Sequence, residues 1–532
     1  MSPPMESKKN GVVLNAQEIA SHRSISSCWI VIDGKAYDVT EYLDEHPGGA
    51  AVLLKQGGTK LAVYLLNDKS ILAALLGMHL EAEASDATAE FRKIHSPDIL
   101  KYLPEYACLG AIDAAAQAAL PISNVSADSI DKPKTEDGAN KVSHISSIVV
   151  PNDFEAAAKI SMPLKSWTYI SSYSHDGSAF RGNLASWQAV RFRPRIFADV
   201  RTVTPECRIL GSASAFPFYV SPMGQLGRGH AVAEIGLVRA LARRGAHGVI
   251  STESTVKMEE IAAAFLEEKK KVTASAAAEN RPEAQLHFQL YIPADREIAI
   301  QRIRRARATG VFHSLWVTVD TAVLGKRSAD RKLQAAEALA ASPDLAAHAE
   351  RAGFGMLSHV GSAQLNASLT WEDVKWMKQE WGGPVVLKGV QTAEDAARAA
   401  ELGVDGVLLS NHGGRQMHDA PDALTTLLEI RTYYPGLVDR LEVFVDGGCR
   451  DGADVLKAVA LGAKAVGVGR PFFYALAAYG EKGVERCLDI FADELITGMR
   501  LVGIKNLDEA QPERVNASRL LNEMWRPEKS RL

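Results

Sequence analysis

Residues 410–416 (Ser-Asn-His-Gly-Gly-Arg-Gln) combine side chains that could move a proton beside an anion. His412 can exchange a proton near neutral pH, and Arg415 offers a fixed fork of donors that suits a carboxylate. The two glycines between them allow positive φ and let the backbone pass close to a flat ligand. An apolar, strand-like run over residues 404–409 precedes this stretch. The alternative interpretation is an ordinary polar turn at a strand end, so the rest of the chain has to decide.

Beyond Pro151, short apolar runs alternate with helical stretches, which predicts repeated β–α units. The helical stretches 231–245, 392–403 and 452–462 each end near a glycine, as helices commonly do. Eight such units predict an α/β fold, a (β/α)8 TIM barrel, with a doubly wound sheet as the alternative. The predicted strands are Phe218–Pro222, Gly248–Thr252, Leu286–Tyr291, Leu315–Asp320, Pro384–Gly389, Gly406–Asn411, Val443–Gly448 and Ala465–Arg470.

Polar side chains gather where these strands end. The carboxyl ends of barrel strands face one rim, and active sites lie there. Most of the strand ends carry one or two such residues, which is more than an ordinary solvent-exposed rim would be expected to show. After the last two strands, glycine-rich turns accompany arginines, and this combination predicts a phosphate cradle of backbone N–H groups. The strand-end residues are Ser251, Gln289, Tyr291, Thr318, Asp320, Lys388, His412, Arg415, Asp446, Arg450 and Arg470.

Length and composition narrow the class of protein. The chain has 532 residues, more than one domain usually holds, and is 47% hydrophobic and 23% charged, as in soluble globular proteins. Its formal charge of -4 gives no reason to expect nucleic acid or an anionic membrane as a partner, and no apolar run is long enough to span a bilayer. The 5 cysteines lack a CxxC spacing, which argues against a disulfide framework and a zinc site and fits a reducing compartment.

The N-terminal part carries a different pattern. Residues 29–39 predict a β-hairpin with an Asp-Gly turn, and His-Pro-Gly-Gly follows at His46. These motifs resemble the cytochrome b5 family, which implies an α+β domain over residues 10–83 and makes His46 one axial ligand of haem b. Lys69 stands where the second axial histidine should be. A protonated lysine is not a strong ligand, so we expect the domain to keep its fold and to have lost or altered its haem; the alternative is that Lys69 loses its proton and coordinates the iron.

Three further boundaries follow from composition. A linker is predicted over residues 84–150, because residues 123–147 mix Ser, Asp, Lys, Asn and Pro with few large apolar side chains. The barrel is expected over residues 151–510 and a C-terminal tail over 511–532. Within the barrel, residues 328–364 are rich in alanine and charge and are expected to form a mobile, lid-like insertion.

From about Phe154 to Val502 the chain resembles the FMN-dependent 2-hydroxy acid oxidases and dehydrogenases, and with the b5-like domain it is similar to their flavocytochrome b2 type. The resemblance implies that His412 takes a proton from the substrate and that Asp320 stabilises the resulting imidazolium. Arg415 and Tyr169 would hold the substrate's carboxylate. Tyr291 would bind its hydroxyl, and Arg327 would add positive potential. The motifs that carry the resemblance are Phe288–Tyr291, Val317–Asp320, Leu324–Arg327, Leu387–Gly389, residues 410–416 and Asp446–Arg450.

The same resemblance implies how FMN is held. Lys388 would face N1 and O2 of the flavin and stabilise the reduced ring, since charge near N1 tunes its electronics. The other expected contacts are Ser251, Gln289 and Thr318 to the isoalloxazine, Asp446 to the ribityl chain, and Gly448, Arg450, Gly469 and Arg470 to the phosphate.

Two positions beside the substrate's side chain depart from the family pattern. Gly224 leaves more room, and Glu253 puts a carboxylate where relatives have an apolar residue. Because an unpaired buried charge is costly, we expect a substrate larger or more polar than lactate or glycolate. The alternative is that Glu253 turns outward to solvent.

Three functions remain at this point. The first is an oxidase that converts an L-2-hydroxy acid to the 2-oxo acid and passes electrons to O2. Its expected location is the peroxisome, because Ser530-Arg531-Leu532 is a conservative variant of the Ser-Lys-Leu address, with the cytoplasm as the alternative. The second is an L-lactate dehydrogenase that passes electrons through haem b to cytochrome c. The third is a catalytically silent flavin- or partner-binding protein. The resemblance also implies a homo-oligomer, usually a homotetramer.

Overall fold

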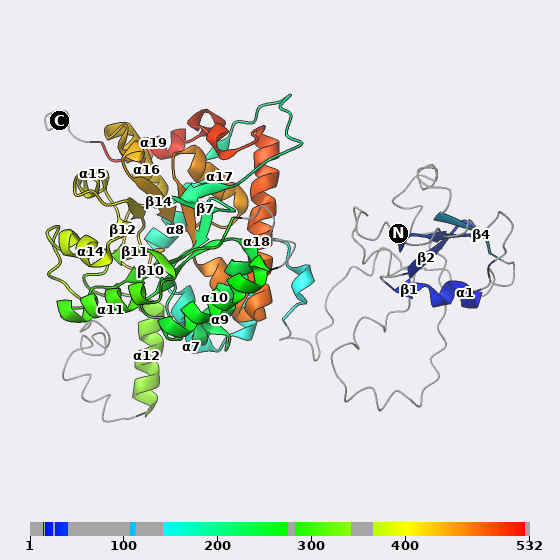
Figure 1. The fold of residues 1–532 in the computed structure, drawn as a ribbon, viewed down its shortest axis with the longest axis horizontal. Coiled ribbons are helices and arrows are strands. Elements are labelled where there is room, and N and C mark those ends of the chain that lie inside the picture. The colour runs from blue at the N-terminus through cyan, green and yellow to red at the C-terminus, as the bar shows by residue number, and fades with distance from the viewer. Residues whose placement is uncertain are drawn as a thin grey trace. The chain divides into compact units, whose positions relative to one another are not determined.

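The structure is a computed structural model with two compact units, Met1–Asp137 and Gly138–Leu532, each of which is described by itself. Figure 1 shows the course of the chain. The described residues are 14, 16–24, 27–40, 107–112, 142–274, 282–341 and 365–526.

Eight parallel strands of the larger unit form a closed barrel in the order β10-β11-β12-β13-β14-β15-β8-β9 (Figure 1). Each coincides with a strand predicted from the sequence, to within a few residues, and the doubly wound alternative is wrong. The strands are β8 (Phe218–Val220), β9 (His247–Ser251), β10 (Leu286–Leu290), β11 (Phe312–Thr318), β12 (Val385–Val390), β13 (Gly406–Leu409), β14 (Glu442–Asp446) and β15 (Ala465–Val468).

Helices follow the strands, and their ends are set by local chemistry. The side chains of Thr392, Asp422 and Asp451 accept N–H groups at the starts of α15, α16 and α17, while Gly245 and Gly382 end α9 and α14 in left-handed conformation. The barrel helices are α9 (Ala233–Arg244), α10 (Met258–Thr273), α11 (Arg296–Ala308), α14 (Asp373–Trp381), α15 (Ala393–Glu401), α16 (Ala423–Tyr433), α17 (Gly452–Ala460) and α18 (Arg470–Val502).

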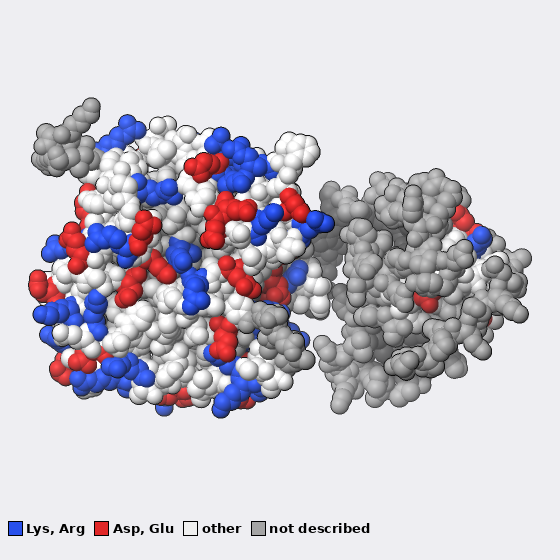
Figure 2. All heavy atoms as spheres, turned by 45° about the horizontal axis from the view of Figure 1, so that its top comes forward, with Lys and Arg blue, Asp and Glu red and all other residues white. Residues whose placement is uncertain are grey.

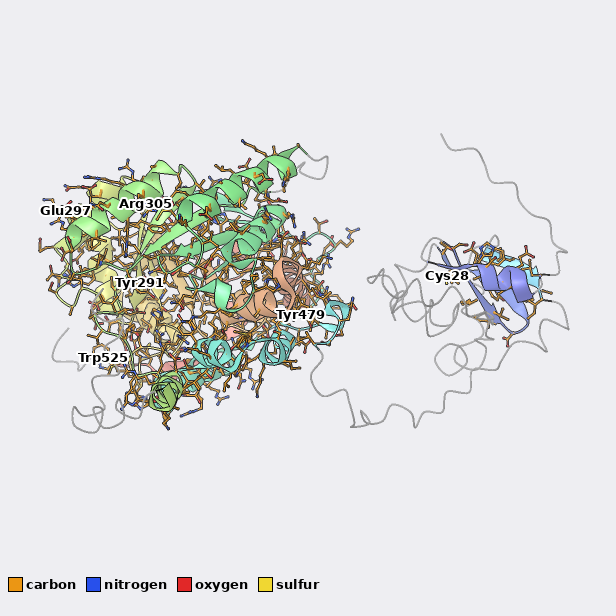
Figure 3. All side chains as sticks on the ribbon, turned by 90° about the horizontal axis from the view of Figure 1, so that it is seen from below. Cys28, Tyr291, Glu297, Arg305, Tyr479 and Trp525 are labelled. Atoms are coloured by element: carbon orange, nitrogen blue, oxygen red, sulfur yellow. The ribbon has the colours of Figure 1, made fainter. Side chains whose placement is uncertain are left out.

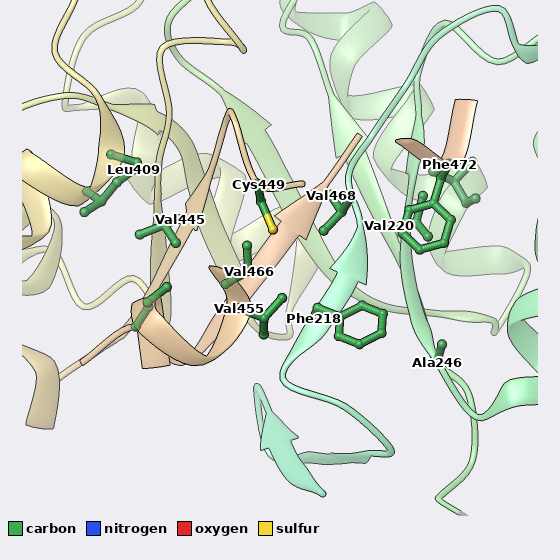
Figure 4. Packing of buried hydrophobic residues seen from close by; sticks show 14 of the residues in the cluster. Phe218, Val220, Ala246, Leu409, Val445, Cys449, Val455, Val466, Val468 and Phe472 are labelled. Carbon is green, nitrogen blue, oxygen red and sulfur yellow. The ribbon is translucent and has the colours of Figure 1, made fainter. Parts of the chain in front are cut away.

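Both faces of the barrel strands are buried. On the outside, side chains such as Val445, Val466 and Val468 pack with Val455 of α17 and Phe472 of α18 in one apolar layer (Figure 4). Because both faces are covered, the strands read as continuous apolar runs rather than as alternating patterns. The inside holds a separate apolar cluster, made of Ile209, Leu210, Tyr219, Val249, Trp316, Val386, Leu408, Phe444 and Ala465.

The end of the barrel at which the strands begin is closed by a hairpin, β6 (Cys207–Ile209) and β7 (Ser212–Ser214). Next to it, buried His247 and His287 from β9 and β10 form a hydrogen-bonded row. His247 Nε2 must donate to the Ala213 carbonyl at 2.9 Å, so its Nδ1 accepts from His287 Nε2 at 3.2 Å. His287 Nδ1 in turn accepts from the hydroxyl of Ser314 at 2.7 Å. All three donors therefore point the same way, and both imidazoles are neutral.

Three helices precede the barrel and pack against it: α6 (Asp153–Ser161), α7 (Leu164–Ser171) and α8 (Ser178–Ala189). The predicted linker ends too late in the sequence, because η5 (Ile145–Ser147) and buried Ile148 already belong to this unit. Tyr479 of α18, labelled in Figure 3, donates its hydroxyl to the Ser143 carbonyl at 2.9 Å.

The predicted C-terminal tail also begins too early. β16 (Val515–Asn516) pairs with β5 (Arg191–Phe192), and α19 (Ser518–Glu523) buries Leu520. The pairing partner lies more than 300 residues earlier in the chain, so composition at the tail gives no sign of it. The predicted insertion 328–364 opens with a helix, α12 (Ser328–Ala341), and its residues 342–364 lie outside the described residues.

In the smaller unit, four strands form one sheet in the order β1-β2-β3-β4, beside α1 (Ala16–Ser21). The predicted Asp-Gly hairpin is confirmed, because Asp33 and Gly34 have φ of 52° and 71° between β2 and β3. The predicted linker also begins too early, since β4, which lies within residues 84–150, pairs with β3 and so belongs to this sheet. His46 and Lys69 lie outside the described residues. The strands are β1 (Arg23–Ser24), β2 (Ser27–Ile32), β3 (Lys35–Asp38) and β4 (Cys108–Ala111).

On the face of the barrel unit shown in Figure 2, acidic and basic side chains are interspersed, and neither sign dominates. This mixture agrees with the small formal charge. None of the helices in the described part of the chain combines the length and the apolar character needed to cross a membrane.

Candidate active site

The loop after β13 has an unusual backbone. Three successive residues, His412, Gly413 and Gly414, have φ of 61°, 64° and 75°, and this left-handed region costs a non-glycine residue about 1–3 kcal/mol. The Ser410 hydroxyl accepts the N–H of His412 at 3.0 Å, and the Asn411 side chain accepts that of Gly414 at 2.9 Å. The strain is therefore held in place by the loop itself, and it lifts the imidazole over the mouth of the barrel.

The protonation of His412 follows from its neighbours. Its Nδ1 lies 2.9 Å from Asp320 Oδ1, and a carboxylate can only accept, so Nδ1 carries the proton. Nε2 is then the free base, 3.4 Å from the hydroxyl of Tyr291. The arrangement is that of a general base oriented by a carboxylate, as the sequence predicts for His412 and Asp320.

Burial and charge tune this pair in opposite directions. Burial lowers the pKa of His412 to about 4; Asp320 opposes this shift, and Lys388 and Arg327 add to it. Burial works against ionisation of Asp320, yet His412 and Lys388 hold the pKa of this carboxyl well below its usual range. Lys388 Nζ lies 3.8 Å from Asp320 Oδ2. At neutral pH, His412 is therefore unprotonated and Asp320 is charged, which is the state a proton acceptor needs.

Arg415 is fixed by the end of a helix. One of its terminal nitrogens donates to the carbonyls of Tyr169, Ile170 and Ser172 at 2.8, 3.2 and 2.9 Å, where the last turn of α7 leaves carbonyls without partners. Burial and, to a smaller extent, nearby Arg327 together lower the pKa of Arg415 to about 9. Arg415 also lies over the Tyr169 ring, at 5.2 Å from its centre. The structure thus brings together the two residues predicted to hold the substrate's carboxylate.

A cavity of about 1030 Å³ opens at this end of the barrel. Most of the predicted site residues line it together. Asp320 lies behind His412 with its side chain fully covered, and Gln289 and Thr318 are not part of the lining. The Gln289 amide lies behind Ser251, whose hydroxyl it accepts at 3.1 Å, and it donates to Thr318 Oγ1 at 2.8 Å. The lining members are Tyr169, Gly224, Ser251, Glu253, Tyr291, Arg327, Lys388, His412, Arg415, Asp446, Gly448, Arg450, Gly469 and Arg470.

The cavity fits FMN in its polar atoms. Four buried atoms in its lining have no hydrogen-bond partner among the described residues: Lys388 Nζ, Arg327 Nε, Asp446 Oδ1 and Ser221 Oγ. A ligand with acceptors for the ammonium and hydroxyl groups for the carboxylate would satisfy them. Gly469 leaves the wall near Arg450 and Arg470 open to a phosphate, because a Cβ there would meet nothing closer than 3.8 Å. Gly448 also lines the cavity, but a Cβ on it would collide with the Asn183 backbone of α8. When bound, FMN supplies a two-electron acceptor, and Lys388 would place a positive charge beside it.

Some site residues were not predicted. Ser221 directly follows β8, so its position at a strand end is the signal that could have found it. Gln225 lines the cavity with a left-handed φ of 60°, and nothing in its sequence neighbourhood indicates this. Asn183 of α8 and Asn411 exchange two side-chain hydrogen bonds of 2.7 and 2.8 Å, which tie α8 to the catalytic loop.

The two departures from the family pattern lie together. A Cβ on Gly224 would come within 3.0 Å of the Glu253 Cβ, and the Glu253 carbonyl accepts the N–H of Gln225 at 2.8 Å. Glu253 is exposed and also lines the cavity. Its carboxylate makes no hydrogen bond or ion pair with the residues that the structure describes.

Two family descriptions match this chain. "FMN-dependent dehydrogenase" matches residues 158–517, and "Cytochrome b5-like Heme/Steroid binding domain" matches residues 15–67. The first covers the barrel with its preceding helices. The second ends before Lys69, the residue at which the sequence departs from the b5 pattern.

Relatives of both electron-acceptor classes are similar to it. The L-lactate dehydrogenase (cytochrome) of Saccharomyces cerevisiae is 34% identical over 95% of this chain and 80% of its own length. The 2-Hydroxyacid oxidase 1 of Homo sapiens is 34% identical over 68% of this chain and 94% of its own length. Among solved structures, a flavocytochrome b2 mutant superposes with a TM-score of 0.62 at 34% identity, covering 73% of this chain and 92% of that one. A mandelate oxidase superposes with a TM-score of 0.58 at 32% identity, covering 70% and 98%.

The site geometry and these matches agree on the chemistry. A base oriented by a carboxylate, an arginine beside it and a cavity suited to a flavin are what oxidation of a CH–OH group next to a carboxylate requires. The chain belongs to the FMN-dependent dehydrogenase family, and it catalyses FMN-dependent oxidation of a 2-hydroxy acid.

Proposed function

We propose that this enzyme oxidises an L-2-hydroxy acid with a side chain larger or more polar than that of lactate, and that it passes the electrons to O2. The observation that carries the substrate proposal is the Glu253 carboxylate in the lining of the cavity, beside the space left by Gly224. A methyl group close to a carboxylate would strip water from the charge and offer no partner in return. A longer or hydrogen-bonding side chain would leave the charge solvated or paired.

The proposed roles follow from the site's contacts. Arg415 and Tyr169 bind and orient the carboxylate, and Tyr291 binds the hydroxyl. His412 takes the proton at Nε2, and Asp320 stabilises the imidazolium across the 2.9 Å hydrogen bond to Nδ1. The carbonyls at the end of α7 hold Arg415 in its position. The chain's contribution is thus to place one base and one cation correctly around a 2-hydroxy acid.

Replacing Glu253 with leucine should make L-lactate a better substrate. Removing the carboxylate removes the desolvation penalty against the lactate methyl group, and one such contact is worth about 1–3 kcal/mol, or roughly 10- to 200-fold in kcat/KM. Stopped-flow reduction of bound flavin by L-lactate and by longer 2-hydroxy acids measures it. Glu260→Leu on exposed α10 is the matched control. No gain with L-lactate, or an equal gain with all acids tested, would contradict the proposal.

The O2 proposal rests on the sequence of the smaller unit, where Lys69 replaces the second axial histidine. Without two strong ligands, haem is not expected to relay electrons. Two relatives named as 2-hydroxy acid oxidases match only 67% and 68% of this chain but more than 90% of their own length. We expect the purified protein to show flavin absorbance without a strong Soret band, and to release peroxide in proportion to the 2-hydroxy acid consumed.

A second candidate is an L-lactate dehydrogenase that reduces cytochrome c through haem b. The observation in its favour is that two relatives of this activity match 95% or more of this chain, including the b5-like part. A Soret band with one haem per chain, together with fast reduction of cytochrome c, would establish it over the oxidase.

Two further proposals concern the location of the protein in the cell and its oligomeric assembly. The tripeptide at residues 530–532, which lies outside the described residues, supports peroxisomal import as the destination; the distribution of a fluorescently tagged chain with and without these residues tests it. A homotetramer is the proposed assembly, and the mass of the purified holoenzyme in solution tests it.

A further inference from the structure

We propose that Arg228 is a positioning residue, which fixes the ring of Tyr169 where Tyr169 meets the substrate's carboxylate. This inference rests on the proposed function, because it assumes that Tyr169 contacts the carboxylate. Arg228 lies outside the lining of the cavity and acts through another residue. It belongs to the loop after β8, whereas Tyr169 belongs to α7.

Arg228 is carried by a rigid loop. The buried carboxylate of Glu234 accepts the N–H groups of Leu226, Thr255 and Val256 at 3.3, 2.9 and 3.2 Å, which locks the loop after β8 onto the loop after β9. The glycine before Arg228 is equally confined, because a Cβ on Gly227 would come within 2.6 Å of Thr255. The backbone that presents Arg228 therefore has little freedom to move.

The side chain of Arg228 is aimed by a strained neighbour. Gln225 has a left-handed φ of 60°, which costs about 1–3 kcal/mol, and strain of this size is kept where the surrounding structure enforces it. Its backbone N–H donates to Glu253, and its side-chain carbonyl accepts Arg228 Nε. The strained residue thus holds Arg228 by one of its nitrogens and fixes the direction of the guanidinium.

The guanidinium ends over the ring of Tyr169, 4.8 Å from its centre. Arg415 lies over the same ring at 5.2 Å. A cation over an aromatic face is attracted by the ring's quadrupole, so the two arginines restrict the ring's rotation. Arg415 is itself held by the end of α7, but Tyr169 is only half-buried and has no other ring contact of this kind within the described residues. Arg228 supplies the restraint from the solvent side of the site.

The test uses binding of pyruvate to the FMN holoenzyme, read from the absorbance of the bound flavin. Pyruvate carries the carboxylate and does not turn over. Arg228→Met should raise the Kd of pyruvate by about two- to five-fold, the size of an exposed cation–π contact. Arg228→Lys keeps the cation and should stay within about two-fold of the wild type. In steady state with the best 2-hydroxy acid, the change should appear in KM with kcat nearly unchanged.

Two controls isolate the contact. Arg398→Met removes the same interaction elsewhere, since Arg398 lies 5.0 Å over the Trp371 ring, and it should leave the Kd unchanged. In a Tyr169→Ala background, Arg228→Met should have no further effect on the Kd. An unchanged Kd in Arg228→Met, or the same fold-change with and without the Tyr169 ring, would overturn the inference. If the wild type binds pyruvate but no 2-hydroxy acid reduces its flavin, the proposed function fails while the pyruvate data still decide the role of Arg228.

Discussion

Replacing His412 with glutamine should slow flavin reduction by about 10²–10⁴-fold, because the imidazole nitrogen that would take the substrate's proton disappears. The glutamine amide can still donate to Asp320, so the change removes the base with little disturbance of its carboxylate. Anaerobic stopped-flow absorbance with the best 2-hydroxy acid measures the rate. FMN content and thermal unfolding, followed in the same preparation, should stay close to the wild type.

The pH dependence gives a second readout of the same residue. The pKa of His412 is lowered to about 4, so the base stays unprotonated as the pH falls from 7 through the ordinary histidine range. In a plot of kcat/KM against pH, the fall on the acid side should therefore lie nearer pH 4 than pH 6.5. This fall should be absent from the His412→Gln variant. His175→Gln is the matched control, since His175 is exposed and lies outside the lining of the cavity. A wild-type rate in His412→Gln would end the assignment of the base.

Replacing Gly414 with alanine should cost more activity than the same change at Gly413. Both glycines have left-handed φ, so alanine is strained by about 1–3 kcal/mol at either position. They differ in space: a Cβ on Gly414 would come within 2.6 Å of the Phe180 backbone, whereas one on Gly413 meets only the end of Arg470 at 3.3 Å. Alanine at 414 must push the catalytic loop away from α8, and a shift of about 1 Å can cost roughly 10²-fold in rate.

Gly413→Ala is therefore the matched control for strain without collision. Flavin reduction and thermal unfolding of both variants separate the two effects. We expect the strained φ to lower the melting temperature of both variants by a similar amount. The rate of flavin reduction should fall more in Gly414→Ala than in Gly413→Ala. Equal rates in the two variants would mean that the approach of the loop to α8 does not matter for catalysis.

The barrel could be predicted from the sequence because its strands are buried on both faces and stand out as apolar runs between helices. The hydrogen-bonded pair of His412 and Asp320 was predictable for a related reason: both residues follow such runs, so one rim must collect them. Contacts between distant segments carry no such local signal. The Asn183–Asn411 pair, the stacking of Arg228 on Tyr169 and the pairing of β16 depend on how the helices and loops outside the barrel pack.

The predicted boundary between the N-terminal domain and the linker was wrong for the same physical reason. Cys108–Ala111 is a short run without a buried residue, and it becomes a strand only because β3 offers an open edge. Composition describes what a segment prefers on its own and contains nothing about an edge formed elsewhere. The position of Glu253 was predictable, and its surroundings show the carboxylate both exposed and lining the cavity, so substrate preference has to be measured.

The one-way row of hydrogen bonds through His247 and His287 makes the floor of the barrel a sensor of acid. A proton added at His247 Nδ1 would face the N–H of His287 Nε2, and burial lowers the pKa of His247 to about 4. An unfolded chain takes up this proton near the ordinary pKa of about 6.5, so unfolding binds protons that the folded barrel refuses. The row therefore contributes its full stabilisation above about pH 6.5, and this contribution is lost as the pH falls from about 6.5 toward 4. The acid tolerance of the enzyme is thus set in part at the end of the barrel that never meets the substrate.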